Sequence, residues 1–275
     1  MISFKQKLVI FLALALAVLL YLAPKQLPEK EPEVISADYT SLIETAKQQI
    51  SPEQKSVVET LEKQVNDEKD VKRKTVLLDS LRKTWLTFKN QELYAIYGQS
   101  IAALENTEQG WMMAGEDFMK AGGQSQNANK ANLYKSAIDC FTKVMKMNPS
   151  NLAAKTKLGT CYVESASLLG NPPMKGITLL HEVIQQDSAN IDANLQLGLF
   201  SVTSQQFEKA IDRFRKILRL DSTRIEMYAY LGDTYLSMGN KPKAIESFEN
   251  YKTRVKDTLI AKNINDYIKK LKQQP

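Results

Sequence analysis

Histidine and cysteine are scarce in this chain of 275 residues, which contains one histidine and two cysteines. Histidine metal sites and catalytic triads are therefore excluded unless His181 itself serves. The two thiols, Cys140 and Cys161, are too few for a cysteine metal site. His181 stands between Leu180 and Val183 in a predicted helix, and we interpret it as a surface residue. The composition thus predicts no catalytic residue and no metal site.

Sequence patterns for phosphate-binding loops and for β-strands are also missing. No glycine-rich loop stands between a strand and a helix, and Ala121-Gly122-Gly123 is predicted to end a helix. We therefore predict an all-α protein that binds no cofactor and is not an enzyme. An enzyme with an unrecognised site stays as an alternative, and a cluster of strongly perturbed acids on one surface would favour it.

No block of like charge stands out, although the net charge is +6. A nucleic-acid-binding chain typically gathers its lysines and arginines along one helix or on one face. Here both signs are mixed along the chain, which suits solubility. We therefore expect no nucleic-acid partner.

One long apolar run is present, from Leu8 to Ala23, and Pro24 closes it. As a helix it spans roughly 24 Å, somewhat less than the hydrocarbon core of a bilayer. Apolar residues before the run, with Lys5 and Lys7 reaching to the interface, can supply the missing length. We predict that residues 1–24 form an uncleaved signal anchor, a single transmembrane helix.

A cleaved signal peptide is the competing interpretation of this run. Tyr21-Leu22-Ala23 followed by Pro24 is a poor cleavage site, and no cysteine follows for a lipoprotein signal. The lysines before the run give a slight positive-inside bias. That bias favours an exported body, which is periplasmic if the protein is bacterial. A body facing the cytosol stays as the alternative.

Residues 25–35 contain Pro28 and Pro32 among alternating charges, and we predict an extended linker. Helical patterns follow over 36–107. Within them, Ser51-Pro52-Glu53 is a strong helix-start signal: a capping hydroxyl, a proline in the first turn and an acid near the positive helix end. We interpret 36–107 as a helical lead-in whose last two helices form either a degenerate repeat unit or a cap on the array that follows.

Two successive segments, 191–224 and 225–257, carry the same residue types about 34 residues apart. The pair Leu197-Gly198 in the first corresponds to Leu231-Gly232 in the second, and an alanine and a phenylalanine follow at equal offsets. This pattern resembles the tetratricopeptide repeat (TPR), which implies two antiparallel helices in close contact. Gly198 and Ala210 would lie where the helices nearly touch, with Phe214 beside them.

Weaker copies of the pattern occupy 108–151, with Ala114-Gly115, and 152–190, with Leu158-Gly159. The first copy is about ten residues too long, and we expect its polar excess, 124–132, to bulge from the turn between its helices. The second is about five residues too long near Gly170-Asn171-Pro172-Pro173. These insertions mark either a binding face or tolerated drift in surface loops.

The final segment, 258–275, is amphipathic and looks like the solvating helix that closes many TPR arrays. The predicted fold is thus an all-α TPR-type solenoid of about four helix pairs over 108–257, with a helical lead-in, a C-terminal capping helix and a single N-terminal transmembrane anchor. The whole resembles uncharacterised membrane-anchored bacterial TPR proteins. Cys140 and Cys161 fall in successive repeat helices; we favour buried free thiols over a disulfide.

The resemblance implies that the first helix of each unit lines a concave groove for a protein or peptide partner. By helical spacing, the groove candidates are Met112, Glu116, Met119, Thr156, Thr160, Val163, Leu195, Leu199, Val202, Ala229, Asp233 and Leu236. They form an apolar strip with a few acids, which suits a polypeptide segment with apolar anchor residues. The strip lacks the cations with which some TPR domains bind the C-terminal carboxylate of a partner. Alternatively, the lead-in helices cover part of this strip.

The resulting hypothesis is a non-enzymatic, membrane-tethered scaffold or adaptor that captures a polypeptide and assists an envelope-associated assembly. An assembly chaperone similar to the TPR portion of cytochrome c maturation factors is the alternative.

Overall fold

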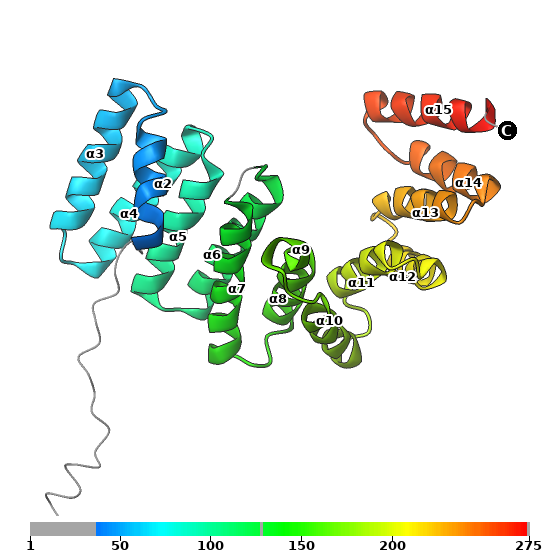
Figure 1. Ribbon diagram of the computed structural model, residues 1–275, viewed down its shortest axis with the longest axis horizontal. Coiled ribbons are helices and arrows are strands. Elements are labelled where there is room, and N and C mark those ends of the chain that lie inside the picture. The colour runs from blue at the N-terminus through cyan, green and yellow to red at the C-terminus, as the bar shows by residue number, and fades with distance from the viewer. Residues whose placement is uncertain (1–36, 127–128, 274–275) are drawn as a thin grey trace, which may run out of the picture. The chain divides into compact units, whose positions relative to one another are not determined.

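The computed structural model describes residues 37–126 and 129–273, and every regular element in these ranges is an α-helix (Figure 1). The helices are α2 (Ala37–Lys47), α3 (Pro52–Asp67), α4 (Val71–Thr87), α5 (Gln91–Glu105), α6 (Glu108–Gln124), α7 (Lys130–Met147), α8 (Leu152–Glu164), α9 (Ala166–Leu169), α10 (Met174–Gln186), α11 (Ile191–Thr203), α12 (Phe207–Leu220), α13 (Glu226–Ser237), α14 (Lys241–Lys252) and α15 (Thr258–Gln273). The all-α prediction is confirmed over these residues.

The predicted anchor (1–24) and linker (25–35) lie outside the described residues. In the part of the chain that the structure describes, no helix has both the length and the apolar character needed to cross a membrane.

Most helix starts are determined locally by a capping side chain. The predicted start at Ser51 is confirmed: its hydroxyl accepts from the amide of Gln54, whose side chain accepts in return from the Ser51 amide at 3.0 Å. Asparagine caps begin α8 and α11, where Asn151 and Asn190 accept from the amides of the third residue on. Such caps each stabilise a helix by about 1 kcal/mol, so the element boundaries follow from short-range chemistry.

Neighbouring helices pack as hairpins, and successive hairpins pack on one another. The pairs are α4 with α5, α6 with α7, α8 with α10, α11 with α12, and α13 with α14. Between hairpins, α5 packs on α6, α7 on α8, α10 on α11 and α12 on α13, while α15 packs on α14. Each helix therefore covers apolar surface of its neighbour that would otherwise be exposed to solvent, as a repeat array requires.

Each of three hairpins closes around a glycine that faces a phenylalanine ring. A Cβ atom placed on Gly198 would lie 2.7 Å from the ring of Phe214, and one on Gly232 would lie 2.6 Å from Phe248. Gly115 faces Phe141 in the same way. The predicted close approach at Gly198 is confirmed, with Ala210 and Phe214 fully buried. In the α8–α10 hairpin, glycine stands on both helices instead, and Gly159 and Gly176 contact each other.

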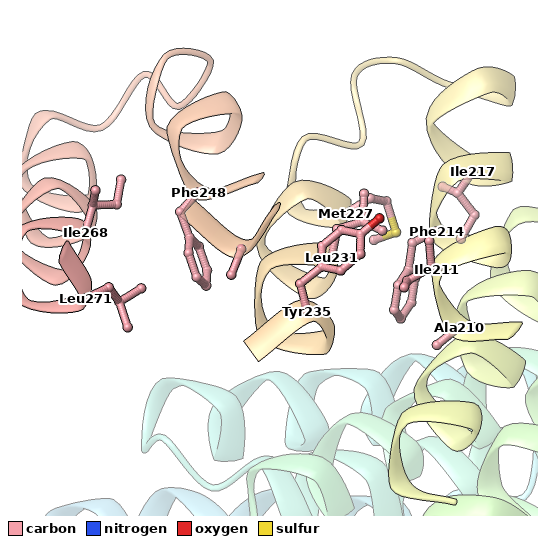
Figure 2. Packing of buried hydrophobic residues seen from close by; sticks show 11 residues of the cluster. Ala210, Ile211, Phe214, Ile217, Met227, Leu231, Tyr235, Phe248, Ile268 and Leu271 are labelled. Carbon is pink, nitrogen blue, oxygen red and sulfur yellow. The ribbon is translucent and has the colours of Figure 1, made fainter. Parts of the chain in front are cut away.

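The apolar core of the C-terminal repeats is continuous from α12 to α15. Figure 2 shows Phe214 beside Met227, and Phe248 on the α14 side of the same cluster. Ile268 and Leu271 of α15 complete the cluster and are nearly inaccessible to solvent. The terminal helix thus covers the apolar face of the last hairpin.

Both helices of the α6–α7 hairpin are longer than those of α11–α12, and the turn between them, from Gln124 to Lys130, falls inside the predicted loop 124–132 and is shorter than it. Helix α6 continues nine residues past Gly115, whereas α11 continues only five past Gly198. Helix α7 likewise begins seven residues before Ala137, and α12 only three before Ala210. The helix end predicted at 121–123 lies one residue before the observed end of α6 at Gln124.

Tertiary contacts hold this lengthened hairpin on both sides. The Tyr134 ring packs against Gly122, and its hydroxyl donates to Glu164 of α8 at 2.9 Å. On the other side, Ser125 and Asn129 donate to the Glu92 carboxylate of α5. These contacts explain why residues with a turn-like composition extend two helices. The five-residue excess of the next hairpin forms α9 and the short loop 170–173.

Helix α2 connects α3 of the lead-in to the α6–α7 hairpin. The Tyr39 ring stacks on the Phe118 ring of α6 with centroids 6.2 Å apart, and the Tyr39 hydroxyl hydrogen-bonds with Ser136 of α7. At the other end of α2, the Lys47 ammonium pairs with Glu62 of α3 at 2.5 Å. The lead-in therefore covers part of the α6–α7 hairpin.

The turn of the α4–α5 hairpin repeats the turns of α11–α12 and α13–α14. In all three, the central residue has positive φ: 60° at Lys89, 59° at Gln205 and 73° at Gly239. The following amide donates to the carbonyl five residues back, at 2.9, 2.7 and 2.8 Å respectively. This shared turn favours the interpretation of α4–α5 as a degenerate repeat unit.

Gln205→Gly is expected to raise the free energy of unfolding by about 1 kcal/mol, because a left-handed backbone strains every side chain that carries a Cβ. The reverse change, Gly239→Gln, should lower it by a similar amount. Urea unfolding followed by circular dichroism measures both. An unchanged midpoint for both variants would contradict the shared turn geometry.

Candidate partner-binding surface

The first helices of neighbouring hairpins lie next to one another: α6 contacts α8, and α8 contacts α11. The Lys157 ammonium of α8 and the Glu116 carboxylate of α6, 3.8 Å apart, join two of them. We use the name wall for the twelve predicted groove positions, which lie on α6, α8, α11 and α13. The wall is the candidate surface for a partner.

Four aliphatic wall residues of α11 and α13 are half-buried: Leu195, Leu199, Val202 and Leu236. Each packs against the core cluster of α12–α15 while part of its surface stays accessible. Helical spacing places Leu195, Leu199 and Val202 on one face of α11. Four further wall residues are also half-buried: Met112, Met119, Val163 and Ala229. These side chains can provide apolar contacts without any rearrangement of the fold.

Two predicted wall residues of α8 lie below the surface. Thr156 and Thr160 are 3% and 2% exposed, and their hydroxyls donate to the carbonyls of Leu152 and Thr156. Helix α8 contacts both α6 and α11, so its middle is covered by its neighbours. Helical spacing gives the direction of a side chain but not how closely the next helix approaches. These two threonines therefore offer a partner no polar group in this structure.

The two predicted wall acids, Glu116 and Asp233, are exposed. Asp233 is partly surrounded by protein atoms, and this desolvation raises its pKa above the ordinary aspartate value. Within the described residues, the Asp233 carboxylate makes no hydrogen bond or ion pair, so no protein cation offsets this desolvation. A partner's cation at this position would stabilise the ionised form.

Sequence reasoning missed two further acids on the same helix faces. Asp192 lies three residues before Leu195, and Glu226 lies three residues before Ala229, so each shares a face with a wall residue. Glu226 pairs with the guanidinium of Arg224 at 2.5 Å. Asp192 is exposed. The i, i+3 spacing was the signal that could have identified both.

A buried ion pair lies beside the wall on α4 and α6. The Arg82 guanidinium donates to Asp117 at 2.9 Å and also to the hydroxyl of Tyr94, while its Nε has no hydrogen-bond partner among the described residues. Burial raises the pKa of Asp117 to about 6, more than the Arg82 charge lowers it. Gly98 of α5 gives the guanidinium room, since an added Cβ would lie 3.3 Å from it. The pair joins three helices, and we assign it a structural role.

In the part of the chain that the structure describes, the remaining titratable candidates form no reactive cluster. His181 is exposed, as interpreted from the sequence. Nearby protein atoms still shield its ring partly from water, and this desolvation, together with the charges of Arg213 and Lys209, lowers its pKa. Cys140 and Cys161 are free and buried, and burial raises the pKa of Cys140 to about 12. Among the described residues, no three histidine, cysteine or acidic side chains are grouped so that they could hold a metal ion.

A similar arrangement of hairpins occurs in solved structures. The crystal structure of PilW, a widely conserved type IV pilus biogenesis factor, superposes with a TM-score of 0.53 and 15% identity over 72% of this chain and 85% of PilW. The fold is that of a TPR protein. The residues that close its hairpins, Gly198 with Phe214 and Gly232 with Phe248, are the ones through which the sequence resembles TPRs.

Other TPR structures show weaker likeness. MamA from Desulfovibrio magneticus RS-1 is 21% identical, with a TM-score of 0.49 over 66% of this chain and 94% of MamA. YrrB, described as a TPR protein with an unusual peptide-binding site, is 17% identical, with a TM-score of 0.45 over 76% of this chain and 99% of YrrB. No protein-family model and no curated protein matches the chain.

Proposed function

We propose that this protein is a non-enzymatic TPR scaffold, tethered to a membrane by residues 1–24, that holds a polypeptide partner against the wall and assists an envelope-associated assembly. The observation that carries the proposal is the row of half-buried aliphatic side chains on α11, Leu195, Leu199 and Val202, continued on α13 by Leu236. Accessible apolar side chains on adjacent helices, flanked by exposed acids, are typical of a surface for a polypeptide segment.

The tether rests on the apolar run from Leu8 to Ala23, which precedes a proline-containing linker. With the amino terminus in the cytoplasm, the TPR body would be exported, and in a bacterium it would face the periplasm. A scaffold held near the bilayer encounters membrane-associated partners at a raised local concentration.

Photo-crosslinking in native membranes tests the proposal. We place p-benzoylphenylalanine in the full chain at three exposed wall-side positions: Glu116, Asp192 and Asp233. Three exposed positions on second helices serve as matched controls: Glu208, Asp212 and Glu246. Protein adducts should form from the wall positions and not from the controls. Equal adducts from both sets, or adducts from the controls alone, would contradict a role for the wall.

Alkaline washing of the same membranes tests the tether. The full chain should stay with the membrane pellet, while a chain beginning at residue 25 should be released, because only a hydrophobic span resists this treatment. Release of the full chain would exclude the anchor. Crosslinking results would still decide the role of the wall.

A further inference from the structure

We infer that the wall between α11 and α13 takes a basic, amphipathic polypeptide segment, whose apolar side chains contact Leu199 and Leu236 and whose lysines or arginines pair with Asp192 and Asp233. This inference rests on the proposed function and deepens it, because it gives the chemical character of the partner.

The first step is the sign of the charge on the wall helices. Six acids lie at the wall positions or three or four residues from them on the same helix, and two lysines do. The acids are Glu108, Glu116, Glu164, Asp192, Glu226 and Asp233, and the lysines are Lys120 and Lys157. The protein as a whole has a net charge of +6, so this surface has the opposite sign to the chain that carries it. A surface acid cluster on a basic protein favours partners that are locally cationic.

The second step is how far the protein already neutralises these acids. Glu226 pairs with Arg224, Glu164 accepts a hydrogen bond from Tyr134, and Glu116 lies 3.8 Å from Lys157. By contrast, in the described ranges 37–126 and 129–273 the carboxylates of Asp192 and Asp233 make no hydrogen bond or close ion pair, although the charge of Asp192 still acts on the Arg224 guanidinium, whose closer partner is Glu226. Two exposed carboxylates on neighbouring repeats are thus available to a partner.

The third step is the apolar surface between these carboxylates. Leu195 and Leu199 lie on the same face of α11 as Asp192, at spacings of three and seven residues. On α13, Leu236 lies three residues after Asp233. A segment that contacts both helices can therefore meet a carboxylate and a leucine on each of them. Lysine and arginine suit such a surface, since their aliphatic stems cover leucine while their charged ends reach a carboxylate.

A selection from random peptides displayed on phage, panned on the detergent-solubilised full chain, tests this inference. Three proteins are compared: wild type, D192K/D233K and E208K/D212K. The control variant changes the net charge equally. It also matches the helix positions, because Glu208 and Asp192 both lie in first turns while Asp212 and Asp233 lie further along their helices. Circular dichroism establishes that all three are folded.

We expect wild type and E208K/D212K to select peptides enriched in both basic and aliphatic residues. D192K/D233K should lose the basic enrichment and bind a peptide selected on wild type at least about tenfold more weakly. Aliphatic enrichment without basic enrichment would overturn the inference and leave the scaffold function standing. Basic enrichment that persists in D192K/D233K would overturn it too, as would no enrichment. Crosslinking of a partner to control positions only would overturn the scaffold function itself.

Discussion

Phe214→Ala is expected to lower the free energy of unfolding by about 3–5 kcal/mol, because the side chain is fully buried and its removal leaves a cavity that rigid helices cannot close. The ring lies against Gly198 of α11 and stacks on Tyr230 of α13, with centroids 5.4 Å apart. One side chain therefore connects a hairpin to the next hairpin. Urea unfolding followed by circular dichroism measures the loss, and a loss below about 1 kcal/mol would contradict this packing.

A double-mutant cycle with Gly198 isolates the close contact. Gly198→Ala alone should lower the free energy of unfolding by about 1–3 kcal/mol, because the new Cβ meets the Phe214 ring. In the Phe214→Ala background the same change should be neutral or stabilising by up to about 1 kcal/mol, since alanine is the better helix former. The sign reversal identifies direct contact as the cause.

Gly123→Ala is the matched control for this cycle. Gly123 also lies in a helix, but a Cβ there would be 4.0 Å from its nearest neighbour, the hydroxyl of Tyr134. The substitution should therefore stabilise the protein by about 0.5–1 kcal/mol in either background. If Gly123→Ala and Gly198→Ala behave alike in the wild-type background, the hairpin does not close on Gly198 as described.

The second large effect is expected at the buried pair of Arg82 and Asp117. Arg82→Met should lower the free energy of unfolding at pH 7 by about 3–5 kcal/mol, because it leaves a buried carboxylate without its cation. The Asp117 side chain is 19% exposed and that of Arg82 is 9% exposed, so solvent screens the pair little. Asp117→Asn in the same background removes the buried charge and should restore much of the lost stability.

The pair also predicts the pH dependence of stability. The pKa of Asp117 is about 6 in the folded protein, above the value of about 3.9 expected when unfolded. Because the folded state favours the protonated carboxyl, this contribution is fully present below about pH 3.9 and is lost as the pH rises through about 6. Relative to Asp117→Asn, wild type should lose on the order of 2 kcal/mol between pH 4 and pH 7.

Arg82→Met should extend this loss to higher pH, since Arg82 is the charge that lowers the pKa of Asp117. Urea unfolding of wild type, Arg82→Met and Asp117→Asn across this pH range measures the effect. Parallel pH curves for wild type and Asp117→Asn would exclude a raised pKa at Asp117.

The hairpins could be predicted from the sequence because their determinants are local. Leu197-Gly198, Ala210 and Phe214 lie within 18 residues, and helical spacing together with one short turn between α11 and α12 brings them together. Capping residues such as Ser51 act over three positions, which is why that helix start was predicted at the right residue. Apolar wall positions on α11 and α13 follow from the same spacing.

The structure alone decided features that depend on contacts between distant helices. The stretch between α6 and α7 has a loop-like composition, yet α6 runs to Gln124 and α7 begins at Lys130, with Ser125 and Asn129 donating to Glu92. Thr156 and Thr160 have groove spacing, yet the neighbours of α8 cover them. Arg82 and Asp117 stand 35 residues apart, and no short-range pattern pairs them.

The sequence by itself determined that this protein is built of antiparallel helix pairs, because a glycine, an alanine and a phenylalanine at repeat spacing allow two helices to touch within one short segment. The tertiary structure decided which of the wall side chains are accessible, and among the residues it describes Asp192 and Asp233 make no hydrogen bond or close ion pair. The physical reason is that accessibility and charge compensation depend on how the next helix packs, and that distance is not encoded in the spacing of residues along one helix.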